Sequence, residues 1–172
     1  ELPKIVAFAV ETAMRRSEIA SLLRANVNLD KRVALLPMTK NGSARGVPLS
    51  SKAVEILESL SKRDDGRCFK SRPDSITKAF ADAIADARNA YTDGLSLHLK
   101  QKKLSQGKID KHISDDPFLM DLRFHDLRHE ATSRLAEIFP LHELTKITGH
   151  QDTRMLMRYY HPRTEDLAKK LQ

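Results

Sequence analysis

Apolar residues recur at helical spacing through the N-terminal part of the chain. They predict two amphipathic helices, Leu2–Thr12 and Ser17–Arg24, joined near residues 13–16. The positions that define this pattern are Ile5, Phe8, Ala9, Ile19, Leu22 and Leu23. Arg15 is therefore predicted to lie at a junction between two helices.

The pattern then changes to short β-prone segments, at Val27–Leu29, Val33–Met38 and Arg45–Leu49. Turn-forming residues separate these segments, and the dipeptide Asn41-Gly42 readily adopts the positive φ angles of a hairpin turn. We therefore predict a small antiparallel sheet. Lys40 lies immediately before the second turn, where a long side chain can project beyond the edge of the sheet.

Helical periodicity returns after the sheet and dominates the rest of the chain. Ser50 or Ser51 can cap a helix that runs to about Ser61, and Asp74 can begin another that runs to about Asn89. The second helix has a predicted buried stripe of Ile76, Phe80, Ala83, Ile84 and Ala87. Further helices are predicted at Phe124–Ile138, Leu141–Thr148, Thr153–Tyr160 and Thr164–Leu171. The predicted fold class is α+β, mainly α-helical, with a small antiparallel sheet attached to a helical core.

The segment from Thr92 to Asp116 departs from this periodicity. Its lysines stand among glycine, serine and aspartate with little sustained apolar spacing, at Lys100, Lys102, Lys103, Lys108 and Lys111. We predict a lysine-rich insertion that is either a mobile loop or a short exposed helix. Two alternatives fit this pattern: lysines that are only solvated, and lysines that contact DNA.

Composition limits the class of partner and the compartment. The 172 residues carry a formal charge of +7 with a pI of about 9.6, which favours a polyanionic partner, although a solvated basic surface also fits. The single cysteine, Cys68, excludes an internal disulfide and is typical of a reducing compartment, so a cytoplasmic location is predicted. No apolar run approaches the ~20 residues that span a bilayer. Because the chain begins at Glu1 within a predicted helix, we expect a fragment that lacks N-terminal sequence.

Several separated side chains fit the chemistry of phosphodiester cleavage, which needs a nucleophile, cations at the phosphate and an acid for the departing oxygen. Arg15 and Arg128 carry guanidinium groups suited to bidentate binding of phosphate oxygens. His125 lies three residues before Arg128, so the two can address the same group. His150 follows Gly149 at a predicted helix junction.

Tyr159 supplies a candidate nucleophile and Lys40 a candidate acid. A free phenol is only about one part in a thousand ionised at pH 7, a cost of roughly 4 kcal/mol that nearby cations and a neutral histidine can reduce. The ammonium group of Lys40, on a hairpin, can move to the leaving 5′ oxygen. Each residue alone has an ordinary structural explanation, such as a helical ion pair between Arg15 and Glu18. Their joint order supports the hypothesis of DNA cleavage by a tyrosine.

Four parts of the chain also match a known set of motifs. Three of them are Thr12–Glu18, Thr39–Gly42 with Val47–Leu49, and Phe124–His129. The fourth begins with Thr148–His150, continues nine residues after His150 with Tyr159, and ends with Tyr160-His161-Pro162. In these motifs the chain resembles the catalytic domain of the tyrosine recombinases, the phage integrase family. The resemblance extends over nearly all 172 residues.

The resemblance implies the catalytic-domain fold of that family over residues 1–172 and a set of site residues. Those around the scissile phosphate would be Arg15, Lys40, His125, Arg128 and His150. Tyr159 would become joined to a 3′ phosphate and release a 5′ hydroxyl, without a metal, ATP or any other cofactor. The supporting residues would be Glu18, Asp126 and His161.

The resemblance also implies partners for a site-specific recombinase. These are double-stranded DNA, other protomers in a synaptic complex that is tetrameric on DNA, and accessory host DNA-bending proteins, with no membrane involved. The location would be the cytoplasm, at the nucleoid, for a protein of bacterial or phage origin. A separate N-terminal DNA-binding domain, outside residues 1–172, would complete a clamp around DNA.

Two other functions stay open at this point. A type IB topoisomerase uses similar chemistry but rejoins the same strand, and a noncatalytic DNA-binding regulator would use residues 141–160 as a helix-turn-helix reader. Tyr160 adjoins Tyr159, but the spacing from His150 and the ending of tyrosine, any residue and histidine favour Tyr159. Leu167 and Leu171 are spaced to dock either on a neighbouring protomer or on their own core.

Overall fold

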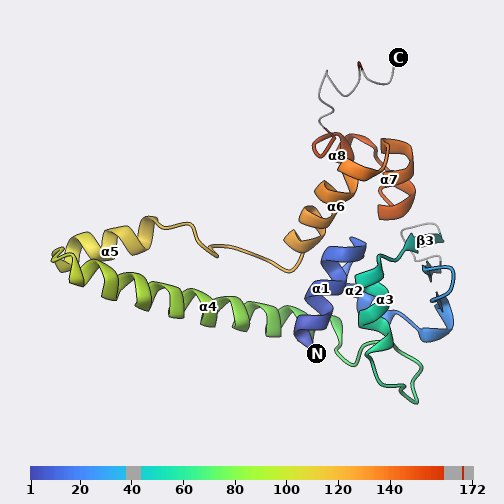
Figure 1. Ribbon diagram of the computed structural model, residues 1–172, viewed down its shortest axis with the longest axis horizontal. Coiled ribbons are helices and arrows are strands. Elements are labelled where there is room, and N and C mark those ends of the chain that lie inside the picture. The colour runs from blue at the N-terminus through green and yellow to red at the C-terminus, as the bar shows by residue number, and fades with distance from the viewer. Residues whose placement is uncertain (38–43, 161–167, 169–172) are drawn as a thin grey trace. The chain divides into compact units, whose positions relative to one another are not determined.

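The computed structural model describes residues 1–37, 44–160 and 168 of the chain. It is mostly helical with one small antiparallel sheet, which confirms the predicted fold class (Figure 1). The chain divides into two compact units: a first unit of Glu1–Pro73 with His125–Gln172, and a second unit of Asp74–Phe124. Lys40, His161 and the helix predicted at residues 164–171 lie outside the described residues, apart from residue 168.

The first two helices meet at a tight, buried turn. Helix α1, Leu2–Thr12, buries the predicted face of Ile5, Phe8 and Ala9 and ends at Ala13, whose φ of 51° is left-handed. The backbone N–H of Ala13 closes the helix on the carbonyl of Ala9 at 3.0 Å. Helix α2, Arg16–Ser21, begins directly after Arg15, which therefore lies at the predicted junction.

The sheet has the predicted antiparallel topology, in the order β1-β2-β3. Its strands are Val27–Asn28, Val33–Leu36 and Arg45–Pro48, and a short 3-10 turn at Arg24–Asn26 precedes β1. Alternate side chains face the core, so that Leu36 and Val47 are buried whereas Leu35 is 57% exposed. Helix α3, Ser51–Glu58, follows the sheet, and the Ser50 hydroxyl accepts a hydrogen bond from the Ala53 N–H at 3.1 Å.

Three helices complete the first unit: α6 at Asp126–Ile138, α7 at Leu141–Thr148 and α8 at Arg154–Met157. Helix α6 packs on α1 and α7, while α7 also packs on β3 and α8. Leu144 and Leu156 form a small core between α7 and α8 with Ala136 of α6. The end of α7 is thereby brought beside strand β3.

The second unit consists of α4 at Pro73–Gln101 and α5 at Gln106–Asp115. The residues after α5 return along α4, because Arg88 donates to the carbonyl oxygens of Ile113 at 2.8 Å and Phe118 at 2.6 Å. The Tyr91 hydroxyl donates to Asp116 at 2.8 Å. These contacts hold the segment 113–118 on one side of α4.

Helix α4 is longer than the sequence pattern predicted, since the prediction ended it near Asn89. Half-buried Tyr91, Leu95 and Leu99, spaced by four residues, continue its apolar face and account for the extension. Of the predicted stripe, Ile76 and Phe80 are buried, but Ala83 and Ala87 are exposed, because methyl groups alone do not define a packed face.

The lysine-rich segment is helical over most of its length, as the end of α4 and as α5, which agrees with the predicted alternative of an exposed helix rather than a loop. All five of its lysines are exposed, namely Lys100, Lys102, Lys103, Lys108 and Lys111. Although α4 has 29 residues, no helix within the described ranges combines the length and the apolar character needed to cross a membrane.

Candidate active site

The C-terminal end of α7 accepts hydrogen bonds from three arginines that belong to three other parts of the first unit. The bonds run from Arg45 Nε to the carbonyl of Ile147 (3.0 Å), from Arg128 Nη2 to Thr148 (2.7 Å) and from Arg15 Nη2 to Gly149 (3.2 Å). The last carbonyls of a helix lack intrahelical donors and carry the negative end of its dipole. This helix end is therefore suited to gather cations.

Arg128 is the most deeply placed of the three, with 4% of its surface exposed. Its Nη1 also donates to the carbonyl of Ala13, the left-handed residue that ends α1. Burial, together with the charges of Arg15 and Arg45, lowers the pKa of Arg128 to about 10, which still leaves it charged at neutral pH. Among the described residues no carboxylate forms an ion pair with Arg128. Two helix-end carbonyls hold this cation instead.

Glu18 joins the other two arginines from a buried position, with 7% exposed. Arg45 binds both of its carboxylate oxygens, at 2.9 and 2.8 Å, and Arg15 binds it through Nη1 at 3.0 Å and through its backbone N–H at 2.7 Å. Burial opposes ionisation, but the hydrogen bonds from Arg45 and Arg15 outweigh it and lower the pKa of Glu18. Three arginines and one carboxylate, 3 − 1, give this cluster a formal charge of +2.

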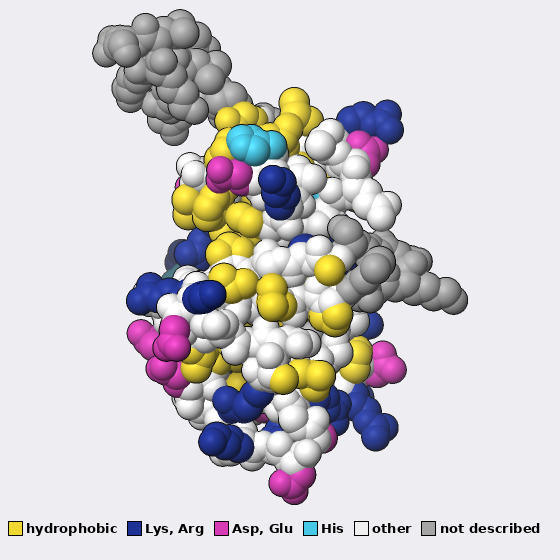
Figure 2. All heavy atoms as spheres, turned by 90° about the vertical axis from the view of Figure 1, so that its right-hand side faces the viewer, with side chains coloured by type: hydrophobic (Ala, Val, Ile, Leu, Met, Phe, Trp, Pro, Cys, Tyr) yellow, Lys and Arg dark blue, Asp and Glu magenta, His cyan; other side chains and the backbone are white. Residues whose placement is uncertain are grey.

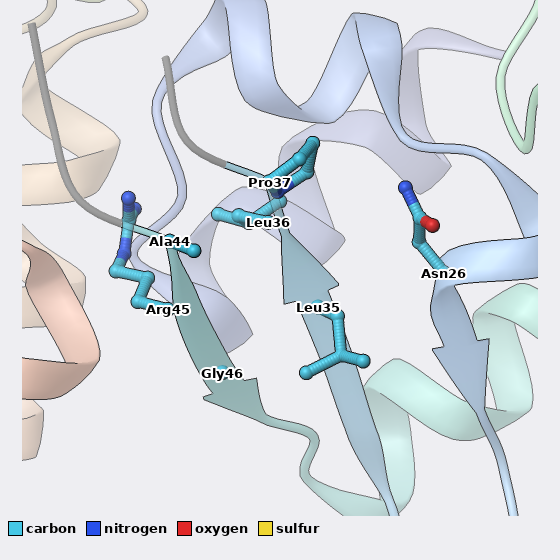
Figure 3. A pocket seen from close by; sticks show the side chains of 7 residues that line it. All are labelled: Asn26, Leu35, Leu36, Pro37, Ala44, Arg45 and Gly46. Carbon is cyan, nitrogen blue, oxygen red and sulfur yellow. The ribbon is translucent and has the colours of Figure 1, made fainter.

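Arg45 was not among the predicted site residues, although the sequence contains a signal for it. On a strand, Arg45 is in phase with the buried Val47 and Leu49, so its side chain should point inward. Figure 3 shows it leaving the start of β3, at the rim of a pocket of about 320 Å³. The pocket's other lining residues, none of them titratable, are Asn26, Leu35, Leu36, Pro37, Ala44 and Gly46. The chemistry of Arg45 therefore lies in its contacts with Glu18 and Ile147.

His150 lies next to the cluster in a defined tautomer. Its Nδ1 is 2.7 Å from the hydroxyl of Thr148, and that hydroxyl already donates its only hydrogen to the carbonyl of Leu144 at 2.7 Å. Nδ1 must therefore carry a hydrogen and donate, which leaves Nε2 as an acceptor in the neutral ring. Burial, followed by the charges of Arg128 and Arg15, lowers the pKa of His150 to about 4. The ring is neutral at physiological pH.

His125 and Asp126 stand at the start of α6. His125 is the N-cap residue and is exposed, and Asp126 is half-buried in the first turn, where the helix dipole favours a negative charge. Partial desolvation, followed by the charges of His129 and Arg128, lowers the pKa of His125. His125 therefore lies within electrostatic range of the arginine cluster.

Tyr159 follows α8 and is half-buried against the small core of Leu144 and Leu156. Its hydroxyl is hydrogen-bonded to Nδ1 of His129, and the two rings are stacked with centroids 6.0 Å apart. The guanidinium of Arg158 lies 5.3 Å from the centre of the Tyr159 ring. His129 was not predicted as a site residue, but it is four residues after His125 and so on the same side of α6.

The structure thus brings Arg15, Arg128 and His150 together at the end of α7, with Glu18 bound to two of the arginines. It links Tyr159 to His125 only through His129, whose ring meets that of His125 edge-on at 4.9 Å. Lys40 and His161 lie outside the described residues.

The surface of the first unit and its possible metal ligands complete the description of the site. On the face of the first unit that Figure 2 shows, lysines and arginines are dispersed among hydrophobic and neutral side chains. Within residues 1–37 and 44–160 no group of three or more histidines, cysteines, aspartates or glutamates is arranged to hold a metal ion.

Gly149 is expected to be required for the cluster, because it has a left-handed φ of 67° and a Cβ here would lie 3.0 Å from Cδ, Nε and Cζ of Arg45. Gly149→Ala should destabilise the fold by about 1–3 kcal/mol, from backbone strain and displacement of Arg45. Urea unfolding measures this. Gly94→Ala, within α4 and with nothing within 4 Å, is the control and should stabilise by about 0.5–1 kcal/mol. A Gly149→Ala protein as stable as the parent would contradict the strain argument.

Both the sequence and the fold are similar to those of known proteins. Residues 2–166 match the sequence profile of the Phage integrase family. A Haemophilus influenzae protein provisionally named integrase/recombinase is 37% identical over 96% of this chain, and the Escherichia coli shufflon-specific DNA recombinase is 34% identical over 95%. The catalytic domain of bacteriophage HP1 integrase has a TM-score of 0.59, at 23% identity, over 96% of this chain and 79% of that domain.

The chain is shorter than the relatives that it matches. The chain spans 46% of the Haemophilus influenzae relative and 35% of the Escherichia coli recombinase. What it shares with them is one part of a longer polypeptide.

Proposed function

The chain belongs to the phage integrase family, the tyrosine recombinases, and from this premise we propose that it is the catalytic domain of a site-specific recombinase. It cleaves and rejoins double-stranded DNA through a covalent 3′-phosphotyrosine, without metal or ATP. The observation that carries the proposal is the arginine cluster at the end of α7. The names of the relatives, integrase and recombinase, support it.

The charge of the cluster suits a phosphate in the middle of substitution. Five-coordinate phosphorus carries more negative charge than the diester, and the cluster offers a formal +2 that is already fixed before DNA binds. Arg15 is 40% exposed and can reach a ligand, while two N–H groups of Arg128 are bound to Ala13 and Thr148 and three remain free for phosphate oxygens. Little reorganisation is therefore needed on binding.

The reaction divides among the site residues in a balanced way. The oxygen of Tyr159 loses its proton to a neutral histidine and forms a bond to phosphorus, the bond to the 5′ oxygen breaks, and Lys40 gives that oxygen a proton. His125 would donate to a phosphate oxygen through an N–H group, neutral His150 would lie beside the phosphate with its Nε2 as an acceptor, and Asp126 and His161 would support them. Because the phosphotyrosine ester keeps the energy of the broken bond, a 5′ hydroxyl from another strand can reverse the step without ATP.

Glu18 has a positioning part in this proposal. It binds both Arg45 on β3 and Arg15 at the start of α2, so it fixes two of the three arginines relative to each other. Without this carboxylate, three like charges would gather at one helix end. Its role is to keep the cluster in one arrangement, and it touches no reacting atom.

The partners follow from the proposed reaction. Strand exchange needs two DNA duplexes, so other protomers in a synaptic tetramer, accessory host DNA-bending proteins and a nucleoid location in the bacterial cytoplasm belong to the proposal. A separate N-terminal DNA-binding domain would close the clamp. The exposed lysines of the segment 92–116 are candidate contacts to the DNA backbone.

A trapping experiment tests the proposed function. Nicked suicide duplexes made from the DNA that flanks the gene lose a short 5′-hydroxyl strand after cleavage, so a covalent complex accumulates. We expect a complex that survives denaturation, with phosphotyrosine in the attached peptide and a 5′ hydroxyl on the released strand. Binding without any such complex would favour a noncatalytic regulator. A complex that relaxes supercoils but never yields recombinant junctions would favour a type IB topoisomerase.

A further inference from the structure

The hydroxyl of Tyr159 hydrogen-bonds neither of the predicted site histidines that the structure describes, His125 and His150. It is hydrogen-bonded to Nδ1 of His129, one residue after Arg128 on α6. In the part of the chain that the structure describes, His129 is the residue that hydrogen-bonds this oxygen. The partner of the candidate nucleophile is therefore a residue outside the predicted set.

The aromatic rings around this contact fix its geometry. The rings of His129 and Tyr159 are inclined by 27°, and the guanidinium of Arg158 lies over the tyrosine ring at 5.3 Å. His129 is also held by the ring of His125, which meets it at 90°. Tyr159 has the additional support of the small core beneath it. The hydroxyl and the imidazole nitrogen are thus held together by packing.

The other nearby histidines are poorly suited to take a proton from this hydroxyl. Within the described residues His150 hydrogen-bonds Thr148 rather than Tyr159, and a ring whose pKa is about 4 is a weak base even at its acceptor nitrogen, Nε2. His125 contacts Tyr159 only through His129. His129, which is hydrogen-bonded to the Tyr159 hydroxyl, is therefore the best placed of the three histidines to accept its proton.

We propose that His129 accepts the proton of Tyr159 when the phenol attacks DNA, an inference that rests on the proposed function. In the neutral ring, Nδ1 is unprotonated and Nε2 carries the hydrogen. As the bond from oxygen to phosphorus forms, the O–H bond of Tyr159 breaks and its proton passes to Nδ1. The leaving 5′ oxygen takes a different proton, from the acid. When a 5′ hydroxyl attacks the phosphotyrosine, that hydroxyl returns its proton to the acid and Nδ1 returns its proton to the phenolate.

The test compares His129→Ala and His129→Asn in single-turnover cleavage of the suicide duplex. The asparagine oxygen can still accept the tyrosine hydrogen bond but cannot take the proton. We expect both variants to form the adduct about 10²–10⁴-fold more slowly than the parent. Added imidazole should restore part of the rate to His129→Ala, where it fits the space, and not to His129→Asn. His142→Ala, on an exposed histidine of α7, is the matched control and should cleave at the parent rate.

A second substrate separates this role from protonation of the leaving group. With sulfur in place of the bridging 5′ oxygen, the leaving group departs without an acid. The defect of His129→Ala should persist on this substrate, and its disappearance would assign His129 to the leaving group and overturn the proposal. If His129→Asn cleaved at the parent rate, His129 would only position the tyrosine. If His129→Ala cleaved faster than the parent, the contact would be one that holds Tyr159 back from the DNA. Either result would refute proton transfer.

Failure of the wider function gives a different result. If the parent protein forms no adduct, the recombinase proposal itself is wrong. If the parent forms the adduct and both His129 variants match it, only the role of His129 is wrong. Far-UV circular dichroism of the two variants confirms that they are folded.

Discussion

Replacing Tyr159 by phenylalanine is expected to abolish the covalent complex with the suicide duplex, whereas Tyr160→Phe should still form it. The loss follows from the removal of the attacking oxygen, since the ring keeps its place on the small core and on His129. Stability should fall by only about 0.5–1.5 kcal/mol, for the hydrogen bond to His129 that is lost. Denaturing gels of labelled DNA measure the complex, and urea unfolding measures the stability.

The pair of variants is matched, because both tyrosines pack against the same core and each substitution removes one hydroxyl. DNA binding in a gel-shift assay should be retained by both, which separates loss of chemistry from loss of affinity. An adduct that persists in Tyr159→Phe and vanishes in Tyr160→Phe would move the nucleophile by one residue and would remove the basis for the role of His129.

Arg128→Met is expected to separate catalysis from folding. Adduct formation should fall by at least ~10²–10³-fold, because a fixed charge at the phosphate is lost. Stability should change by no more than about 2 kcal/mol, since the penalty for leaving the carbonyls of Ala13 and Thr148 unpaired is offset by removal of a buried charge. The lowered pKa of Arg128 has the same origin, in burial that disfavours its charge.

Three comparisons sharpen this prediction. Arg128→Ala adds a cavity and should be clearly less stable than Arg128→Met. Arg128→Lys keeps the charge but not the planar fork that reaches two carbonyls, so its cleavage should fall between the parent and Arg128→Met. Arg134→Met, on an exposed arginine of the same helix, should change neither quantity. Parent-like cleavage by Arg128→Met would show that the cluster does not act on the phosphate.

Much of the fold was predictable because its periodicities are local. The helices around Ile5 and Leu144 and the strands around Val33 and Val47 follow from spacing alone. The prediction stopped short at Asn89 because Gly94 and a run of polar residues masked the continuing face of Tyr91, Leu95 and Leu99. Spacing reports which face is apolar, but it does not report how far a polar helix continues when another segment folds onto it.

The candidate site was predictable in part, for a related reason. Arg15 and Arg128 were found because motifs carry them, whereas Arg45 and His129 act through contacts that join distant parts of the sequence. Arg45 sits 102 residues from the carbonyl that it binds. A strand pattern predicts that Arg45 faces inward, but only the packing of α7 on β3 gives it a partner. The catalytic roles of all the predicted site residues stay predictions, and Lys40 and His161 also lie outside the described residues.

Three consecutive carbonyls at the end of α7, those of Ile147, Thr148 and Gly149, hold the three arginines, so the position of the arginines depends on the length of that helix. Each added residue turns an α-helix by about 100° and advances it by about 1.5 Å. A single insertion ahead of Ile147 would swing all three acceptors to another side and release Arg15, Arg45 and Arg128 together. The number of residues in this short helix therefore determines where the three guanidinium groups are held. Substitutions on its exposed surface leave that arrangement unchanged as long as the number of residues is kept.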